Sequence, residues 1–207
     1  AYIFGAETAL SNGSAGVYVP ASLESLTITS SVSEVPAYAF YGCTGLKEIS
    51  GLENATAYGD YAFAYTGLET FSVPASVQTV GDNAFAGCSA LTAIEVAEGN
   101  ATYASFDGCL YEEGLETLLL VPMNKTEISF SPSVKEIASY AFRSGRVTSV
   151  EIPDSVETIG FAAFYGCSSL ESMSLPFIGG SRTENTYMLH VFGGSYTVEG
   201  SNITFSN

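Results

Sequence analysis

The sequence predicts a repeat solenoid, a mostly β coil in which short parallel strands stack on one another. Two observations predict this fold: one sequence pattern recurs along the chain, and its copies follow at a nearly constant spacing. The clearest copies are SVSEVPAYAFYGCTGL at 31–46, SVQTVGDNAFAGCSAL at 76–91 and SVETIGFAAFYGCSSL at 155–170. Partial copies end at Leu68 and Val147. Self-similarity at a period of about 20–50 residues is the signature of repeat architectures.

An Ala-Phe pair inside each copy sets the period. Three of the four intervals between its phenylalanines are 22 or 23 residues, and the fourth, of 57 residues, is one unit plus 35 extra residues. The five phenylalanines are Phe40, Phe63, Phe85, Phe142 and Phe164. A unit of this length cannot bury its own apolar face, so neighbouring coils must stack on it. We therefore expect these rings to form a spine inside the coil.

The segments between the copies have the pattern of short strands. Alternating apolar, β-branched positions in LETFSVPASV, VTSVEIPDSV and LESMSLPF are typical of a strand. Pro74, Pro153 and Pro176 end these strands, because proline cannot donate to a strand ladder. A second short extended piece follows, as at 156–160, and the Ala-Phe segment after it is expected to form one helical or 3₁₀ turn.

The extra residues predict one inserted β-hairpin. NATYASFDGCLYEE, at 100–113, places Asp107-Gly108 between alternating apolar and small residues. An Asp-Gly dipeptide flanked in this way is a strong short-range hairpin signal. Residues 118–122 and 126–130 are expected to add further strands, which would make this block one longer coil.

The whole chain, 1–207, is predicted to be a single solenoid cut from a longer array. It divides into a partial N-terminal unit (1–30), regular repeats (31–91), the longer coil with its hairpin (92–134), regular repeats (135–176) and an incomplete C-terminal unit (177–207). Similar Phe-Gly segments near both ends, YIFGA at 2–6 and HVFGG at 190–194, support the idea of a fragment.

Charge excludes two classes of partner. The chain has 22 acidic and 6 basic residues and a formal net charge of −16. Such a surface repels phosphate backbones and anionic lipids, so we expect no nucleic acid partner. No stretch approaches the roughly 20 apolar residues of a membrane span. The scattered acidic residues favour a solvated exterior, with a site for a cation or a basic protein as the alternative.

The cysteines are expected to be free, buried thiols. Three of the four share one repeat context, so they occupy equivalent positions in different coils and lie too far apart for a disulfide. Small buried thiols at such positions pack as hydrophobic groups. The four are Cys43, Cys88, Cys109 and Cys167.

No motif indicates catalysis, a metal or a cofactor. The single histidine, His190, has only Cys167 near it in sequence as a nucleophile, and nothing beyond co-occurrence pairs them. Glu112-Glu113 is the adjacent acidic pair, and its place beside a glycine favours a solvated turn over a glycosidase site. Close Cys or His pairs that would hold zinc are absent from the sequence, as is an acidic calcium loop. We therefore expect no enzyme, no metal and no cofactor.

Tyrosines are the remaining candidates for binding. Seven of them flank the Ala-Phe pairs in register. The favoured interpretation buries each ring at a corner of the coil with its hydroxyl in water, and the alternative is a stripe that binds proteins or sugars. The sequence does not select a binding face. The seven are Tyr38, Tyr41, Tyr58, Tyr61, Tyr65, Tyr140 and Tyr165.

The repeat resembles the BspA-like (type 5) leucine-rich repeats. The shared pattern is strand, Pro, Ser-Val, x-x-Ile-Gly, x-x-Ala-Phe, x-Gly-Cys-Ser-x-Leu. An Asn-x-x-Tyr…Asp-Gly-x-Leu-Tyr block, here spanning 100–111, is also similar to the family's. The chain departs from the pattern at Thr66 and Gly145, where the family has cysteine, so those coils are expected to be locally distorted.

The resemblance implies a right-handed leucine-rich-repeat coil and a secreted or surface-anchored bacterial protein of adhesin type. It implies a host or extracellular-matrix protein or glycan as partner, and it supplies no catalytic residues. A structural stalk for another domain and a carbohydrate-binding accessory module are the alternatives. Fold resemblance alone does not establish any of these functions.

Overall fold

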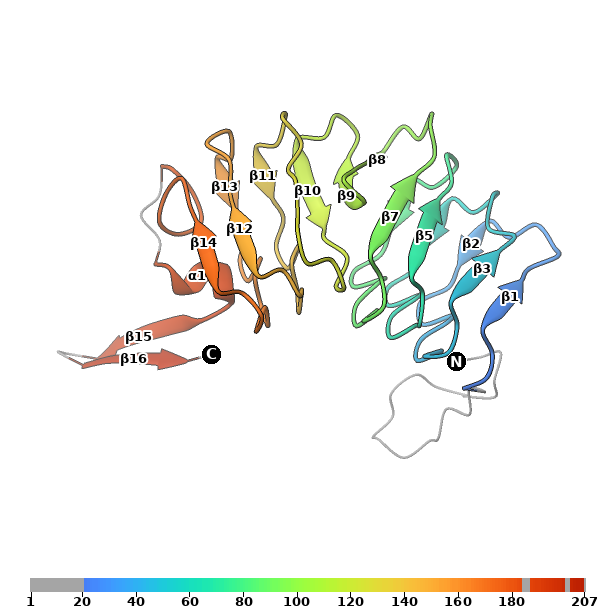
Figure 1. Ribbon diagram of the computed structural model, residues 1–207, viewed down its shortest axis with the longest axis horizontal. Coiled ribbons are helices and arrows are strands. Elements are labelled where there is room, and N and C mark those ends of the chain that lie inside the picture. The colour runs from blue at the N-terminus through green and yellow to red at the C-terminus, as the bar shows by residue number, and fades with distance from the viewer. Residues whose placement is uncertain (1–20, 184–186, 200–201, 207) are drawn as a thin grey trace. The chain divides into compact units, whose positions relative to one another are not determined.

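The computed structural model describes residues 21–183, 187–199 and 202–206 and shows the predicted solenoid of short, mostly parallel strands (Figure 1). It consists of two compact units, Ala1–Tyr103 and Ala104–Asn207, called unit 1 and unit 2 below. The N-terminal Phe-Gly segment lies outside the described residues. Among the described residues, no helix has the length and apolar character needed to cross a membrane.

Unit 1 is built from two rows of parallel strands. The longer strands form the pairs β1 (Ser25–Thr27) with β3 (Glu48–Ser50) and β5 (Thr70–Val73) with β7 (Ala93–Val96). The shorter ones form one ladder in the order β2 (Glu34–Val35), β4 (Ala57–Tyr58), β6 (Thr79–Val80). Three successive coils therefore contribute one strand to each row, and β7 begins the next coil.

The long strands alternate between core and solvent, as the sequence pattern predicts. In β5, Phe71 and Val73 are buried, whereas Thr70 and Ser72 are exposed. Successive side chains of a strand point to opposite faces, so one face can pack on the core while the other stays polar.

The Ala-Phe segments are turns and not helices. Their i→i+3 hydrogen bonds are of 3₁₀ type, as from Cys43 N to Phe40 O (3.2 Å). The alternate N–H groups donate instead to the next coil, as from Phe40 N to Ala62 O (2.7 Å). A left-handed residue two positions before and two positions after each phenylalanine produces this alternation. These pairs are Tyr38 and Gly42, Tyr61 and Tyr65, Asn83 and Gly87, Tyr140 and Ser144, and Ala162 and Gly166.

The predicted phenylalanine spine is present in both units. Ring centroids lie 5.5 Å apart for Phe40 and Phe63 and 5.2 Å apart for Phe63 and Phe85. In unit 2 the rings of Phe142 and Phe164 are 4.3 Å apart. All five rings are at most 3% exposed, so the repeated pair anchors each coil to its neighbours.

Unit 2 contains the inserted hairpin. Its five-stranded sheet has the order β13 (Thr158–Ile159), β11 (Glu136–Ile137), β10 (Thr117–Leu120), β9 (Cys109–Glu112), β8 (Tyr103–Phe106). The predicted Asp107-Gly108 turn joins β8 to β9, with φ of 51° and 69°. Positive φ at both central residues is the geometry of a type I′ hairpin turn. A separate parallel pair, β12 (Ser149–Glu151) with β14 (Ser172–Ser174), forms the row of longer strands.

The strand expected at 126–130 is absent, so that prediction is wrong. Two backbone N–H groups, one in this segment and one directly after it, bind side chains instead of joining a strand ladder. Ser129 N donates to a carboxylate oxygen of Asp107 (2.7 Å), and Ser131 N donates to the Tyr111 hydroxyl (3.3 Å). Ile128 and Phe130 still pack against the core of unit 2.

The C-terminal part continues the stack with different secondary structure. The short helix α1 (Leu189–Phe192) provides carbonyl groups for the preceding coil, from Ala162 N to His190 O and from Phe164 N to Val191 O, both at 2.8 Å. This is the hydrogen-bond pattern of an Ala-Phe turn. The antiparallel hairpin β15 (Ser195–Glu199) and β16 (Asn202–Ser206) follows.

Candidate binding surface

The thiols are parts of the packing. All four cysteines are free, as predicted. Cys43, Cys88 and Cys109 are also buried, as predicted, whereas Cys167 is only half-buried. Burial raises the pKa of the Cys43, Cys88 and Cys167 thiols, which disfavours the reactive thiolate. Cys88 Sγ donates to Phe63 O (3.1 Å), and Cys167 Sγ donates to Phe142 O (2.9 Å). These thiols therefore tie coils together.

Thr66 takes the place of a cysteine in this arrangement. It is 3% exposed, and its hydroxyl donates to Phe63 O (2.8 Å) and lies 3.3 Å from Cys88 Sγ. The deviation in this coil falls instead on the residue before it. Tyr65 has a φ of 58°, at the position where Gly42 and Gly87 stand in the neighbouring coils.

The other candidates for chemistry are not gathered into a site. His190 lies on α1 with its ring 5.6 Å from that of Phe161, whereas Cys167 is engaged with Phe142. Glu112 and Glu113 are exposed at the end of β9 and in the turn after it. Groups of three or more His, Cys, Asp or Glu that could hold a metal ion do not occur within the described ranges.

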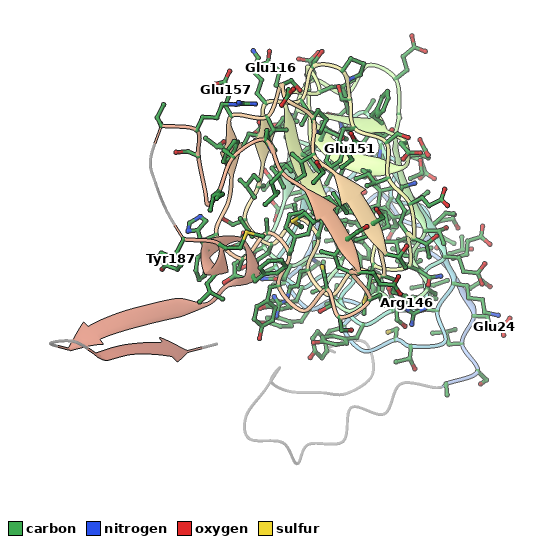
Figure 2. All side chains as sticks on the ribbon, turned by 60° about the vertical axis from the view of Figure 1, so that its left-hand side comes forward. Glu24, Glu116, Arg146, Glu151, Glu157 and Tyr187 are labelled. Atoms are coloured by element: carbon green, nitrogen blue, oxygen red, sulfur yellow. The ribbon has the colours of Figure 1, made fainter. Side chains whose placement is uncertain are left out.

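A shallow depression in unit 2 contains carboxylates, but they do not converge. The Asp154 side chain is fully exposed, and the guanidinium of Arg182 is committed to the backbone, with its Nε donating to Val156 O (3.0 Å). Figure 2 shows Glu116 and Glu157 at the outer edge of the short strands. They flank Lys135, whose pKa is raised by its hydrogen bond to Glu116. The depression itself is lined by Asp154, Ser155, Glu157, Thr158, Arg182 and Thr183.

Asn100 is a structural residue that the sequence pattern only hinted at. Its side-chain nitrogen donates to Pro74 O (2.8 Å) and Val77 O (2.9 Å). Its side-chain oxygen accepts from the N–H groups of Thr102 (2.9 Å) and Tyr103 (2.8 Å). The side chain thus fastens the start of β8 to the coil before it, within unit 1.

Four tyrosines of unit 1 form a cluster at the Ala-Phe turns. Tyr38 and Tyr61 are stacked at 5.2 Å with their planes 4° apart, and Tyr41 packs edge-on against Tyr65 at 5.2 Å. Tyr65 is 46% exposed, and the other three are half-buried. Burial and then the neighbouring phenols raise the pKa of Tyr41. These four residues are called the unit 1 tyrosine cluster.

Tyr58 does not belong to that cluster. It was expected at a coil corner with a wet hydroxyl, but it is 1% exposed, and its hydroxyl has no hydrogen-bond partner in the described structure. A signal for this existed in the sequence. Tyr58 stands five residues before Phe63, where the equivalent residues of other coils, such as Val35 and Ile137, are apolar and buried.

Unit 2 has an aromatic cluster at the same turns, with a cation in it. Tyr140, Phe161 and Tyr165 are 44%, 40% and 46% exposed. The guanidinium carbon of Arg143 lies 5.7 Å from the ring centroid of Tyr140 and 5.9 Å from that of Tyr165. These distances are typical of cation–π contacts.

The long-strand face is polar and satisfies its own hydrogen bonds. Ser50 Oγ donates to Thr27 Oγ1 (3.1 Å) in unit 1, and Ser172 Oγ donates to Ser149 Oγ (2.7 Å) in unit 2. Within the described ranges, none of the exposed large apolar side chains lies on this face. The candidate binding surface is therefore formed by the two aromatic clusters at the Ala-Phe turns, which are called the aromatic turn edges below. Their exposed rings are Tyr65 in unit 1 and Tyr140, Phe161 and Tyr165 in unit 2.

A solenoid of stacked repeats with a continuous surface belongs to the class of repeat proteins that act as interaction scaffolds. The chain is a member of the BspA type leucine-rich repeat family, whose model matches residues 14–120 and 122–193 in six copies. Repeats of this fold are typically non-catalytic and generally bind proteins. No curated protein matches the chain.

Solved bacterial structures share the fold. The pneumococcal vaccine antigen PcpA is 29% identical over 76% of this chain, with a TM-score of 0.67. A leucine-rich cell surface protein of Faecalibacterium prausnitzii is 31% identical over 74% of this chain, with a TM-score of 0.64. The chain spans 41% of the length of each of these two proteins. A leucine-rich repeat protein of Eubacterium ventriosum, 22% identical over 72% of this chain and 53% of its own, has a TM-score of 0.55 and shows the fold alone.

Proposed function

We propose that this chain is an extracellular, surface-displayed binding scaffold of adhesin type, which contacts a host or matrix protein through the aromatic turn edges. The observation that carries the proposal is the exposure of aromatic rings at the Ala-Phe turns of both units. Tyr65 in unit 1 and Tyr140 and Tyr165 in unit 2 are each more than two fifths exposed, next to buried spine phenylalanines. Tyrosine supplies a large, stiff contact area with a hydroxyl, which is why interfaces are enriched in it.

The rigidity of the turns supports this choice of surface. The backbones of Tyr65 and Tyr165 are hydrogen-bonded to a neighbouring coil, through Tyr65 N to Ala86 O (2.8 Å) and Ser144 N to Tyr165 O (2.7 Å). Backbone held in this way loses little conformational freedom on binding, so the loss of conformational entropy offsets less of the contact energy.

Surface display is supported by the family and by one of the similar proteins. The Faecalibacterium prausnitzii structure is that of a leucine-rich cell surface protein. Among the present residues, the acidic excess agrees with a solvated exterior.

The test is binding of the full 207-residue chain to panels of immobilised matrix proteins and glycans at physiological salt. We expect saturable binding to at least one protein, and a loss of about tenfold or more in the Tyr140→Asn/Tyr165→Asn variant, a size typical of interface tyrosines. Asparagine is chosen because Tyr140 has a φ of 61°, which asparagine tolerates.

Tyr187→Asn is the matched control, because Tyr187 is 36% exposed but lies outside the Ala-Phe register. Equal losses in the variant and the control would remove the turn edges from the proposal. Binding to glycans alone would favour a carbohydrate-binding accessory module. Absence of any binding would overturn the scaffold proposal and favour a stalk. The long-strand face suits a stalk, because its polar side chains hydrogen-bond to one another.

A further inference from the structure

Unit 2 supplies its own cation to its aromatic cluster. Arg143 directly follows the spine residue Phe142, and its guanidinium lies within 6 Å of the rings of both Tyr140 and Tyr165, whose centroids are 6.3 Å apart. Two exposed tyrosines on adjacent coils thus form a seat for a guanidinium. Tyr165 occupies in its coil the position that Arg143 occupies in the coil before, directly after the spine phenylalanine.

Unit 1 has a tyrosine cluster at the same turns but no arginine. The residues that directly follow its spine phenylalanines are Tyr41, Ala64 and Ala86. Residues 1–103 contain ten acidic residues and one basic residue, Lys47. Lys47 is paired with Glu24 at 3.2 Å, at the start of the long strands. No basic side chain of residues 1–103 is therefore provided to this cluster as Arg143 is provided in unit 2.

Unit 1 also places carboxylates where unit 2 has none. Asp60 and Asp82 are exposed and stand three residues before Phe63 and Phe85. Their carbonyl groups accept from the cluster's own backbone, from Tyr38 N (2.9 Å) and Tyr61 N (3.0 Å), so both aspartates border the cluster.

The side chains of this border are partly held in place. Asp60 Oδ1 accepts from Asp82 N (2.9 Å), which fixes one carboxylate oxygen. In unit 2, the equivalent positions are Ser139 and Phe161. The acidic border is thus specific to the cluster that has no arginine of its own.

We propose that the unit 1 tyrosine cluster, with Asp60 and Asp82, docks an arginine from an extended basic segment of the partner protein. The partner would supply in trans the guanidinium that Arg143 supplies within unit 2. Arginine fits better than lysine, because its planar group stacks on aromatic faces and donates in parallel to carboxylates. This inference rests on the proposed scaffold function and names the chemistry of its partner.

The probe is a seven-residue peptide of alternating Gly and Arg with acetyl and amide ends, titrated into the full chain by calorimetry at physiological salt. We expect saturable binding that weakens about tenfold in the Tyr41→Ala/Tyr65→Gly variant, as the loss of a partly desolvated cation–π contact implies. Tyr41→Phe/Tyr65→Phe keeps the rings and should bind within about twofold of the unaltered chain. The lysine version of the peptide should bind several-fold more weakly.

The acidic border is tested with charge-matched variants. Asp60→Asn/Asp82→Asn and Glu69→Gln/Glu95→Gln remove the same charge, but only the first pair borders the cluster, because Glu69 directly precedes the long strand β5 and Glu95 lies in the long strand β7. We expect about a fivefold loss for the aspartate pair and less than about twofold for the glutamate pair, since distant charges are screened. This comparison also keeps the test valid if the Tyr41→Ala variant fails to fold.

Three results would overturn the inference: no peptide binding, equal losses in the two charge-matched variants, or equal affinity for the arginine and lysine peptides. The last two would mean diffuse attraction to an acidic chain. If the peptide fails while matrix proteins still bind, the docked arginine is refuted and the scaffold function stands. If the peptide binds at this cluster while no protein binds, the scaffold function fails instead.

Discussion

The rings of Phe63 and Phe85 stack in adjacent coils of unit 1, with 5.2 Å between centroids and 12° between planes. Phe71 fills the space beside them at 4.8 Å and 4.9 Å from the two rings. The repeat spacing of the Ala-Phe pair is thus converted directly into a continuous aromatic core. Coils that are individually too small to fold hold each other through these rings.

Truncating one ring of the spine should be costly. Phe85 is 3% exposed, so we expect Phe85→Ala to lower the free energy of unfolding by about 3–5 kcal/mol, as for other buried phenylalanines. Phe161→Ala is the control, because that ring is 40% exposed. Urea unfolding followed by circular dichroism measures both. A loss below about 1 kcal/mol for Phe85→Ala would show that the ring does not carry the core.

Asn100 should be nearly as important as a spine ring, although it is polar. Its four hydrogen bonds satisfy two carbonyl and two N–H groups of unit 1. Asn100→Ala leaves these groups without their partner, so we expect a loss of about 2–4 kcal/mol in the free energy of unfolding. Asn54→Ala, at an exposed asparagine, should change it by less than about 0.5 kcal/mol. Similar effects of the two substitutions would contradict the assigned role.

Two buried tyrosines should respond oppositely to loss of their hydroxyl. The Tyr58 hydroxyl is buried without a partner in the described structure, whereas the Tyr111 hydroxyl accepts from Ser131 N. We expect Tyr58→Phe to be neutral or to stabilise by up to about 1 kcal/mol, and Tyr111→Phe to destabilise by about 1–2 kcal/mol. Thermal melts of the two variants decide this. Destabilisation by Tyr58→Phe would indicate a hydrogen-bond partner for that hydroxyl.

Stability should fall in alkaline solution through Tyr111. Burial raises its pKa from 10.0 to about 12, so the folded state holds its proton more tightly than the unfolded state does. The stabilisation from this group is fully present below pH 10 and is lost as the pH rises toward 12. Urea unfolding at several pH values above 9 should therefore show a smaller decline for Tyr111→Phe than for the unaltered chain. Parallel declines would exclude Tyr111 as a source.

Local pattern predicted more of the fold than of the surface. The spacing of Phe40, Phe63 and Phe85 predicted the spine, and Asp107-Gly108 predicted the hairpin, because both signals depend on neighbours in sequence. The absent strand at 126–130 could not be predicted in this way. The N–H groups of Ser129 and of Ser131, directly after the segment, donate to Asp107 and Tyr111, which folding brings from another part of the chain.

The candidate site was predictable only as a register of tyrosines. Sequence indicated which turns carry Tyr65, Tyr140 and Tyr165, but exposure depends on how neighbouring coils pack. The cation seat of Arg143 depends on a residue from the next coil, Tyr165, so no local pattern contains it. The acidic border at Asp60 and Asp82 becomes meaningful only once the coils are aligned.

The residues with positive φ that follow each spine phenylalanine test how the coils are fitted to one another. Two residues after the spine phenylalanine, three coils have glycine, whereas the coil that contains Arg143 has Ser144 there, with a φ of 56°. Serine is strained there and glycine is not, so we expect Ser144→Gly to stabilise by up to about 1 kcal/mol.

The converse substitution in the next coil should do the opposite. Gly166 has a φ of 73°, and a Cβ there would lie 3.1 Å from Ser144 Oγ, so Gly166→Ala should destabilise by about 1–2 kcal/mol. Urea unfolding of the two single variants measures both signs. Opposite signs would establish that each Ala-Phe turn needs a left-handed residue after its ring. Destabilisation by Ser144→Gly would mean that the serine side chain contributes more than its backbone strain costs.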